Sequence, residues 1–166
     1  MESRTIGVHN APIWRKKTDY IFMAKVDDYE GMAQEQLWGR RVGENSFEVC
    51  CIPFFIYDLA LGDIVEIDEA SWLKRVVERS GRAVYRAWFG SVLPAGQLEV
   101  IAEVERLGGI VERSSDHLVA IDAATKARAH AVLGALSAFQ ERNLVTFEVG
   151  SAQGTPRATS SPTLPM

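Results

Sequence analysis

Hydrophobic and polar residues alternate through the first half of the chain with the period of two that β-strands show. Residues between the runs are rich in Gly, Asn and Ser, which favour turns. Gly43-Glu44-Asn45 predicts one hairpin, and Arg79-Ser80-Gly81-Arg82 predicts a second. The pattern therefore predicts a small antiparallel β-barrel-like domain over residues 19–82. The alternating runs cover residues 20–26, 36–42, 46–52, 61–67, 72–78 and 84–89.

The period changes to that of helices after Phe89. An apolar stripe predicts a helix over 95–107, and a second stripe predicts a helix from 123 to about 141 with Asp122 as its N-cap. Together with the strand at 84–89, the order of elements is β-α-β-β-α-β, which is that of a ferredoxin-like domain over residues 83–150. The remaining strands are expected at residues 109–113, 117–121 and 144–149.

The fold class is therefore α+β, with a barrel-like domain followed by a ferredoxin-like βαββαβ domain. The two helices cover one face of the second sheet, so we expect the N-terminal domain or a second subunit to cover the other, which would permit a homodimer. Residues 1–18 have no clear period and are expected to form a flexible, loosely docked arm. Residues 151–166 are rich in Ser, Thr and Pro and are expected to be a disordered tail.

The charge balance argues against two classes of partner. The chain of 166 residues has 18 basic and 22 acidic side chains, a net charge of −4, and neither half is basic. Nucleic acids and anionic membranes attract strongly basic surfaces, so we expect neither as a partner. No signal peptide or transmembrane run is visible. Cys50 and Cys51 are neighbours with poor geometry for a mutual disulfide, which favours the cytoplasm.

The sequence contains no recognisable catalytic, metal or cofactor set. The three histidines lack metal-ligand spacing, and no phosphate-binding glycine motif occurs. Cys50, Cys51 and Ser80 have no evident histidine base, and Asp63, Glu66 and Asp68 are better explained as a solvated sheet edge. We therefore predict no catalytic residues, no metal site and no cofactor.

The predicted second hairpin places four arginines on one face. With Ser80-Gly81 as the loop, Arg79 opposes Arg82 and Arg75 opposes Arg86, while Trp88 extends the same face. Like charges opposite one another destabilise a hairpin, so stability alone does not explain the pattern. Guanidinium groups beside an indole suit an acidic or planar anionic partner. The alternative is that carboxylates such as Glu48, Glu66 or Asp68 neutralise the arginines internally. The predicted binding residues are Arg75, Arg79, Arg82, Arg86 and Trp88.

Two functions remain open on this basis. The first is a non-enzymatic binding or accessory protein, such as an immunity protein, that recognises an acidic protein surface or a small anion through the arginine face. The alternative is a small enzyme or metabolite-binding protein with its site in the groove between the two domains. In that alternative Arg75 and Arg86 orient an anion, and Glu78, Asp58 or Asp63 acts as the acid or base.

Several segments together resemble a known family. They are Leu37-Trp38, Val42-Gly43, Ile52-Pro53-Phe54-Phe55, Leu61-Gly62-Asp63-Ile64-Val65 and Val76-Val77-Glu78-Arg79-Ser80-Gly81. The chain resembles, over about residues 19–149, a bacterial family catalogued as domain of unknown function number 4265. The family has no established activity, so the resemblance implies a bacterial protein without implying a reaction.

Overall fold

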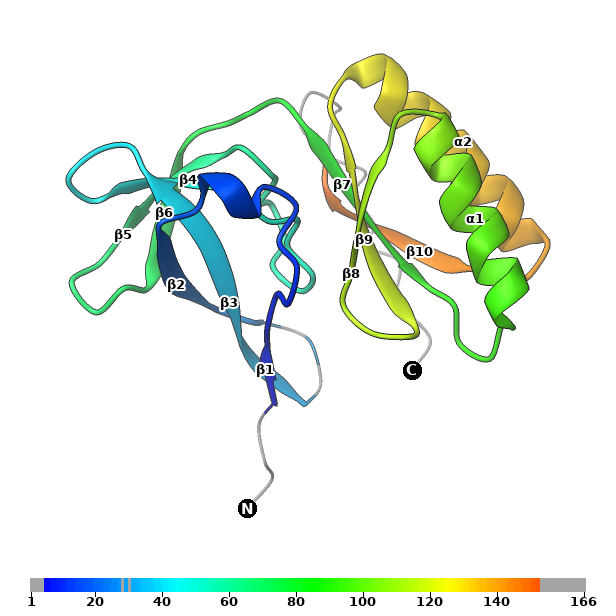
Figure 1. Cartoon of the computed structure of the whole chain (residues 1–166), viewed down its shortest axis with the longest axis horizontal. Coiled ribbons are helices and arrows are strands. Elements are labelled where there is room, and N and C mark those ends of the chain that lie inside the picture. Colours follow the sequence, from blue (N-terminus) through cyan, green and yellow to red (C-terminus); the bar gives the residue numbers. More distant parts are fainter. Residues whose placement is uncertain (1–4, 28, 30, 153–166) are drawn as a thin grey trace.

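The computed structural model describes residues 5–27, 29 and 31–152. It is a mixed α+β fold with two α-helices and two mainly antiparallel sheets (Figure 1). The elements are β1 (Thr5–Gly7), the 3-10 helix η1 (Arg15–Lys17), β2 (Tyr20–Lys25), β3 (Met32–Arg41), β4 (Ser46–Val49), β5 (Ile64–Ile67), β6 (Leu73–Glu78), β7 (Ala83–Trp88), α1 (Pro94–Arg106), β8 (Ile110–Arg113), β9 (Leu118–Ala123), α2 (Lys126–Glu141) and β10 (Thr146–Ser151).

The first sheet has the order β1-β3-β4-β5-β6, and β2 pairs with β3. The predicted hairpin around Gly43-Glu44-Asn45 is confirmed, because β3 and β4 pair antiparallel with Arg40 opposite Glu48. The sheet is not a closed barrel. Between β2 and β6 there is only an isolated bridge from Met23 to Trp72, so no ladder joins the two strands among the described residues.

The second sheet has the order β10-β7-β9-β8, with every pair antiparallel. Both helices lie on one face of it (Figure 1). The expected β-α-β-β-α-β order over this part of the chain is present. The predicted N-cap is wrong: Ala123 still belongs to β9, and the Thr125 side chain caps α2 by accepting the Arg128 N–H.

The predicted second hairpin is also wrong. β6 pairs with β5 in the first sheet, whereas β7 pairs with β9 and β10 in the second. Gly81 has the positive φ of 82° that suits a turn. However, residues 79–82 form neither a turn nor a bend, and they carry the chain from one sheet into the other, so β6 and β7 do not face each other.

The chain itself covers the face of the second sheet that the helices leave open. Ile52, Phe54 and Phe55, which precede β5, form one buried cluster with Val84 and Ala120 of the second sheet. The N-terminal part of the chain thus covers this face of the second sheet, which was one of the two predicted possibilities. Because that face is occupied, it is not available for the homodimer contact that we had considered.

The N-terminal segment differs from the flexible arm that we expected. Over residues 5–18, β1 pairs in parallel with β3, and His9 is only 3% exposed. The segment is thus part of the packed fold. Ser151, the first residue of the predicted disordered tail over 151–166, is instead buried in β10, and the predicted tail beyond Ala152 lies outside the described residues. No described helix combines the length and the apolar character needed to cross a bilayer.

Candidate functional site

An irregular buried segment between the two sheets needs partners for its backbone. Residues 50–61 contain no regular strand, and residues 50–56 are all buried. A buried N–H group without a partner is costly. Two carboxylates meet this need: Glu35 of β3 accepts from the N–H groups of Phe54 (2.7 Å) and Phe55 (2.9 Å), and Glu112 of β8 accepts from that of Ile52 (2.8 Å). Each sheet therefore contributes one carboxylate to hold the segment.

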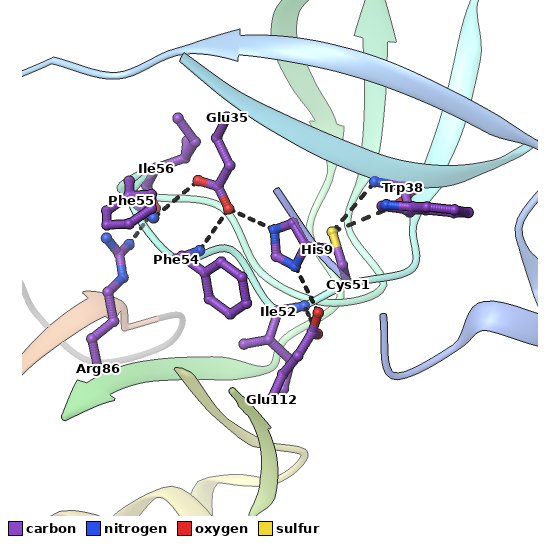
Figure 2. A network of polar contacts seen from close by, with 10 residues as sticks. All are labelled: His9, Glu35, Trp38, Cys51, Ile52, Phe54, Phe55, Ile56, Arg86 and Glu112. Carbon is purple, nitrogen blue, oxygen red and sulfur yellow. Dashed lines mark hydrogen bonds and ion pairs between the residues drawn. The ribbon is translucent and has the colours of Figure 1, made fainter. Parts of the chain in front are cut away.

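His9 lies between the same two carboxylates (Figure 2). Its Nε2 is 2.7 Å from Glu35 Oε1, and its Nδ1 is 2.6 Å from Glu112 Oε1. The imidazole also stacks on the Phe54 ring, with 4.0 Å between ring centroids. The N-terminal segment thus connects a carboxylate of the first sheet to one of the second, and we call His9, Glu35 and Glu112 the buried clamp.

The clamp requires His9 to carry a positive charge. Both ring nitrogens face carboxylate oxygens, so both donate only if the ring is an imidazolium. Burial alone would lower the pKa of His9, but the neighbouring Cys51, Glu112 and Glu35 outweigh burial and raise that pKa to about 12. His9 therefore stays protonated at neutral pH and compensates part of the buried negative charge.

Cys51 lies beside the clamp, and its thiol interacts with the His9 side chain. Its side chain is fully buried, and its Sγ accepts the Trp38 N–H at 3.4 Å. Burial raises the pKa of the Cys51 thiol, which disfavours the thiolate. Both ring nitrogens of His9 are within hydrogen-bond distance of carboxylate oxygens. Together these side chains connect the N-terminal segment and residues 50–56 to both sheets.

The charge on His9 predicts a particular pH dependence of stability. A histidine whose pKa is raised on folding contributes fully to stability below its unfolded pKa of about 6.5, and that contribution falls as the pH rises toward the folded value. Between about pH 7 and about pH 8, below the range where unfolded cysteines ionise, we expect a loss of roughly 1 kcal/mol per pH unit that His9→Gln removes. Urea unfolding of both proteins at several pH values measures this slope, and equal slopes would contradict it.

The predicted arginine face is not formed, and its two outer members each have an internal carboxylate nearby. Arg75 donates its Nε–H to Glu66 at 2.8 Å, and Arg79 lies 3.6 Å from the buried Asp63. Both remain accessible, with side chains 65% and 48% exposed. The hydrogen bond from Arg75 lowers the pKa of Glu66. Glu66 therefore neutralises the charge of Arg75 within the chain, as the alternative in the sequence analysis predicts.

The inner members belong to the interior. Arg82 binds both oxygens of the buried Asp122, at 2.8 and 2.7 Å. Arg86 is 1% exposed, contacts the Ile56 carbonyl, and lies 3.7 Å from Glu148. Trp88 is half-buried and packs in the apolar cluster between the sheets. These three side chains hold β7 in place and do not form one surface with Arg75 and Arg79.

The residues of the enzyme alternative are not brought together either. Arg75 is exposed on the first sheet, whereas Arg86 is buried on the second. Asp63 is fully buried, and its carboxylate accepts from the N–H groups of Ala60 and Ser80. It therefore connects the turn at Leu61-Gly62 to the segment between β6 and β7. Within the ranges that the structure describes, no three His, Cys, Asp or Glu side chains form a group able to hold a metal ion.

Sequence reasoning missed the clamp, although one signal pointed to it. Glu35 shares the inward face of β3 with Leu37 and Gly39, all of them buried. A carboxylate at an inward position of an alternating strand requires a buried partner. The identity of that partner was not accessible, because His9 and Glu112 are 103 residues apart.

Comparison with known proteins identifies the family. Residues 35–147 match the family model described as a domain of unknown function (DUF4265). The chain belongs to this family. The DUF4265 match includes both carboxylates of the clamp and begins after His9. The resemblance inferred from the sequence is confirmed, over a slightly shorter range.

This DUF4265 chain was also compared with curated proteins and with solved structures. No curated protein matches it. A solved structure described as "Novel crystal structure of a hypothetical protein from Neisseria gonorrhoeae" is similar, with a TM-score of 0.69 and 21% identity over 82% of this chain and 99% of that chain. At this level of identity the likeness shows a shared fold.

Proposed function

We propose that this DUF4265 chain is a non-enzymatic binding protein that recognises an acidic segment of a partner protein along the outer edge of β6. The observation that carries the proposal is the exposure of Arg75 and Arg79, 65% and 48%, on and beside the last strand of the first sheet. Arginine forms paired hydrogen bonds with carboxylates, so exposed arginines suit an acidic partner.

The position of β6 supports an extended partner. β6 pairs with β5 along one edge, and no strand of the described chain forms a ladder along its other edge. Such an edge leaves backbone N–H and C=O groups available to a further strand. The register shifts between Val76 and Glu78, so Val77, which is 47% exposed, is the extra residue of a β-bulge between Arg75 and Arg79. A partner segment with acidic residues on both sides of an apolar one complements these three side chains.

The proposal narrows the five predicted binding residues to two. Arg82, Arg86 and Trp88 have structural partners in the interior, so they support β7 and take no part in recognition. We also propose that the two sheets are two domains, a β-rich one ending near Arg82 and a ferredoxin-like one over 83–150. Their separate apolar clusters support this division. The free thiols of Cys50 and Cys51 fit a cytoplasmic setting.

A charge substitution tests recognition at β6. The probe is a fluorescent peptide that alternates glutamate with valine. We expect Arg75→Glu combined with Arg79→Gln to weaken its binding at least about tenfold, because two charge-assisted contacts are lost. The free energy of unfolding should change by no more than about 2 kcal/mol, since both side chains are largely exposed and Asp63 keeps the N–H groups of Ala60 and Ser80.

The matched control changes two exposed arginines on the helices. Arg106 and Arg142 are 67% and 57% exposed and pair with Glu103 and Glu99. Arg106→Glu combined with Arg142→Gln makes the same change in charge away from β6, and we expect it to leave peptide binding unchanged. Equal weakening by both double variants, or no binding to the unmodified chain, would contradict recognition at β6.

A further inference from the structure

A cavity of about 360 Å³ lies between the start of α2 and the strands β7 and β10. It is lined by Tyr85 of β7 and Val149 of β10, which are paired neighbours, and by Ala129 and Leu133 of α2. Val149 is 41% exposed, so an apolar side chain faces solvent here. The volume falls in the range of small-molecule sites, and the lining is mainly apolar, as in such sites.

Tyr85 gives the cavity a fixed aromatic wall. The residue is only 5% exposed, and its hydroxyl donates to the Ala129 carbonyl at 3.1 Å. This bond ties β7 to α2, so the ring cannot rotate away without breaking it. A planar apolar group is therefore matched by a preformed surface, which lowers the entropic cost of binding.

The polar part of the lining is basic. Lys126 and His130 are four residues apart on α2 and therefore share one side of the helix. No lining residue is acidic, and the first turn of α2 has no acidic residue either. Within the described part of the chain, no carboxylate forms an ion pair with Lys126 or His130. A basic group that has no carboxylate partner among the described residues and lies beside an apolar cavity complements an anionic ligand.

We propose that this cavity binds a small organic carboxylate with a planar apolar body. The body packs against Tyr85, Leu133 and Val149, and the carboxylate accepts hydrogen bonds from the Lys126 ammonium group. The lining extends to Gly81, two residues after Arg79, but it includes no residue of β6, and the proposal uses neither Arg75 nor Arg79, so it does not depend on the proposed partner recognition.

Three probes with the same phenyl group test the chemistry of the cavity. Phenylacetate, 2-phenylethylamine and 2-phenylethanol are titrated into the full-length, isotope-labelled chain, and amide NMR shifts are followed. We expect phenylacetate to cause saturable shifts at Ala129, Leu133 and Val149 with a dissociation constant of about 1 mM. The amine and the alcohol should bind at least about tenfold more weakly. Inorganic phosphate, which lacks the apolar body, should also bind more weakly.

Two variants and a control assign the binding to the cavity. Lys126→Glu should weaken phenylacetate binding about tenfold or more, and Ala129→Leu should abolish it by filling the space. Lys74→Glu, which changes an exposed lysine on β6, should have no effect. Amide spectra show whether each variant keeps its fold. Absence of saturable shifts, equal binding of the amine, equal binding of phosphate, or insensitivity to Lys126→Glu would overturn the proposal.

Discussion

His9→Ala is expected to lower the free energy of unfolding by about 3–5 kcal/mol, because it leaves two buried carboxylates without their shared cation. Glu35 is fully buried and Glu112 is 4% exposed, so water cannot replace the imidazolium well. The variant also loses the stacking contact between His9 and Phe54. Urea unfolding measures the effect through the shift in midpoint at constant slope.

Two comparisons separate the charge effect from a general loss of packing. Adding Glu112→Gln to His9→Ala removes one of the uncompensated charges, so the pair should be less destabilised than the sum of the single changes predicts. His117 is an exposed histidine, and His117→Ala should change stability by less than about 0.5 kcal/mol. A similar cost for His9→Ala and His117→Ala would contradict the clamp.

Arg86→Met is expected to cost about 3–5 kcal/mol as well, since Glu148 then lies buried without its guanidinium. Arg86 is 1% exposed and Glu148 is 5% exposed, and the Arg86 guanidinium also lies over the Tyr57 ring, 4.7 Å from its centroid. Methionine fills much of the same volume without a charge. Glu148 keeps the hydrogen bond from the Tyr57 hydroxyl, so the loss reports a buried carboxylate without a cation together with the lost contact to the Ile56 carbonyl, and thermal or urea unfolding measures it.

Two further variants distinguish the effect of the unpaired charge from the loss of the arginine side chain itself. Arg86→Met combined with Glu148→Met removes both charges and should recover much of the lost stability, as buried ion pairs replaced by apolar residues often do. Arg75→Met, at an exposed arginine, should change stability by less than about 1 kcal/mol. If Arg86→Met proved as mild as Arg75→Met, Arg86 would be a surface residue and its buried role would be wrong.

The sequence was most informative where one local pattern determines one structure. The apolar stripes predicted both helices, and the turn at Gly43-Glu44-Asn45 predicted the β3–β4 hairpin. The turn predicted at Ser80-Gly81 is absent: Gly81 has positive φ, but residues 79–82 form neither a turn nor a bend. A sequence that favours a turn does not determine whether the strands beside it pair with each other. Here β6 pairs within the first sheet and β7 within the second.

The site could not be predicted for a related reason. The alternation on β3 marks Glu35 as inward, but it does not reveal which cation meets it. The partner comes from an N-terminal segment without periodicity, and the second carboxylate comes from a distant strand. Similarly, the arginines could be seen in the sequence while their carboxylates could not, since Asp122 is 40 residues from Arg82.

The protonation of His9 is the most direct test of the buried clamp. In a sample with isotope-labelled histidine, the ring nitrogen shifts distinguish an imidazolium, with both nitrogens protonated, from a neutral ring. At about pH 8.5, about two units above the ordinary histidine pKa, we expect His9 to remain doubly protonated while His117 serves as an internal reference in the same spectrum. A neutral His9 ring with one unprotonated nitrogen at that pH would contradict the clamp and would leave His9 free to act as a base toward Cys51.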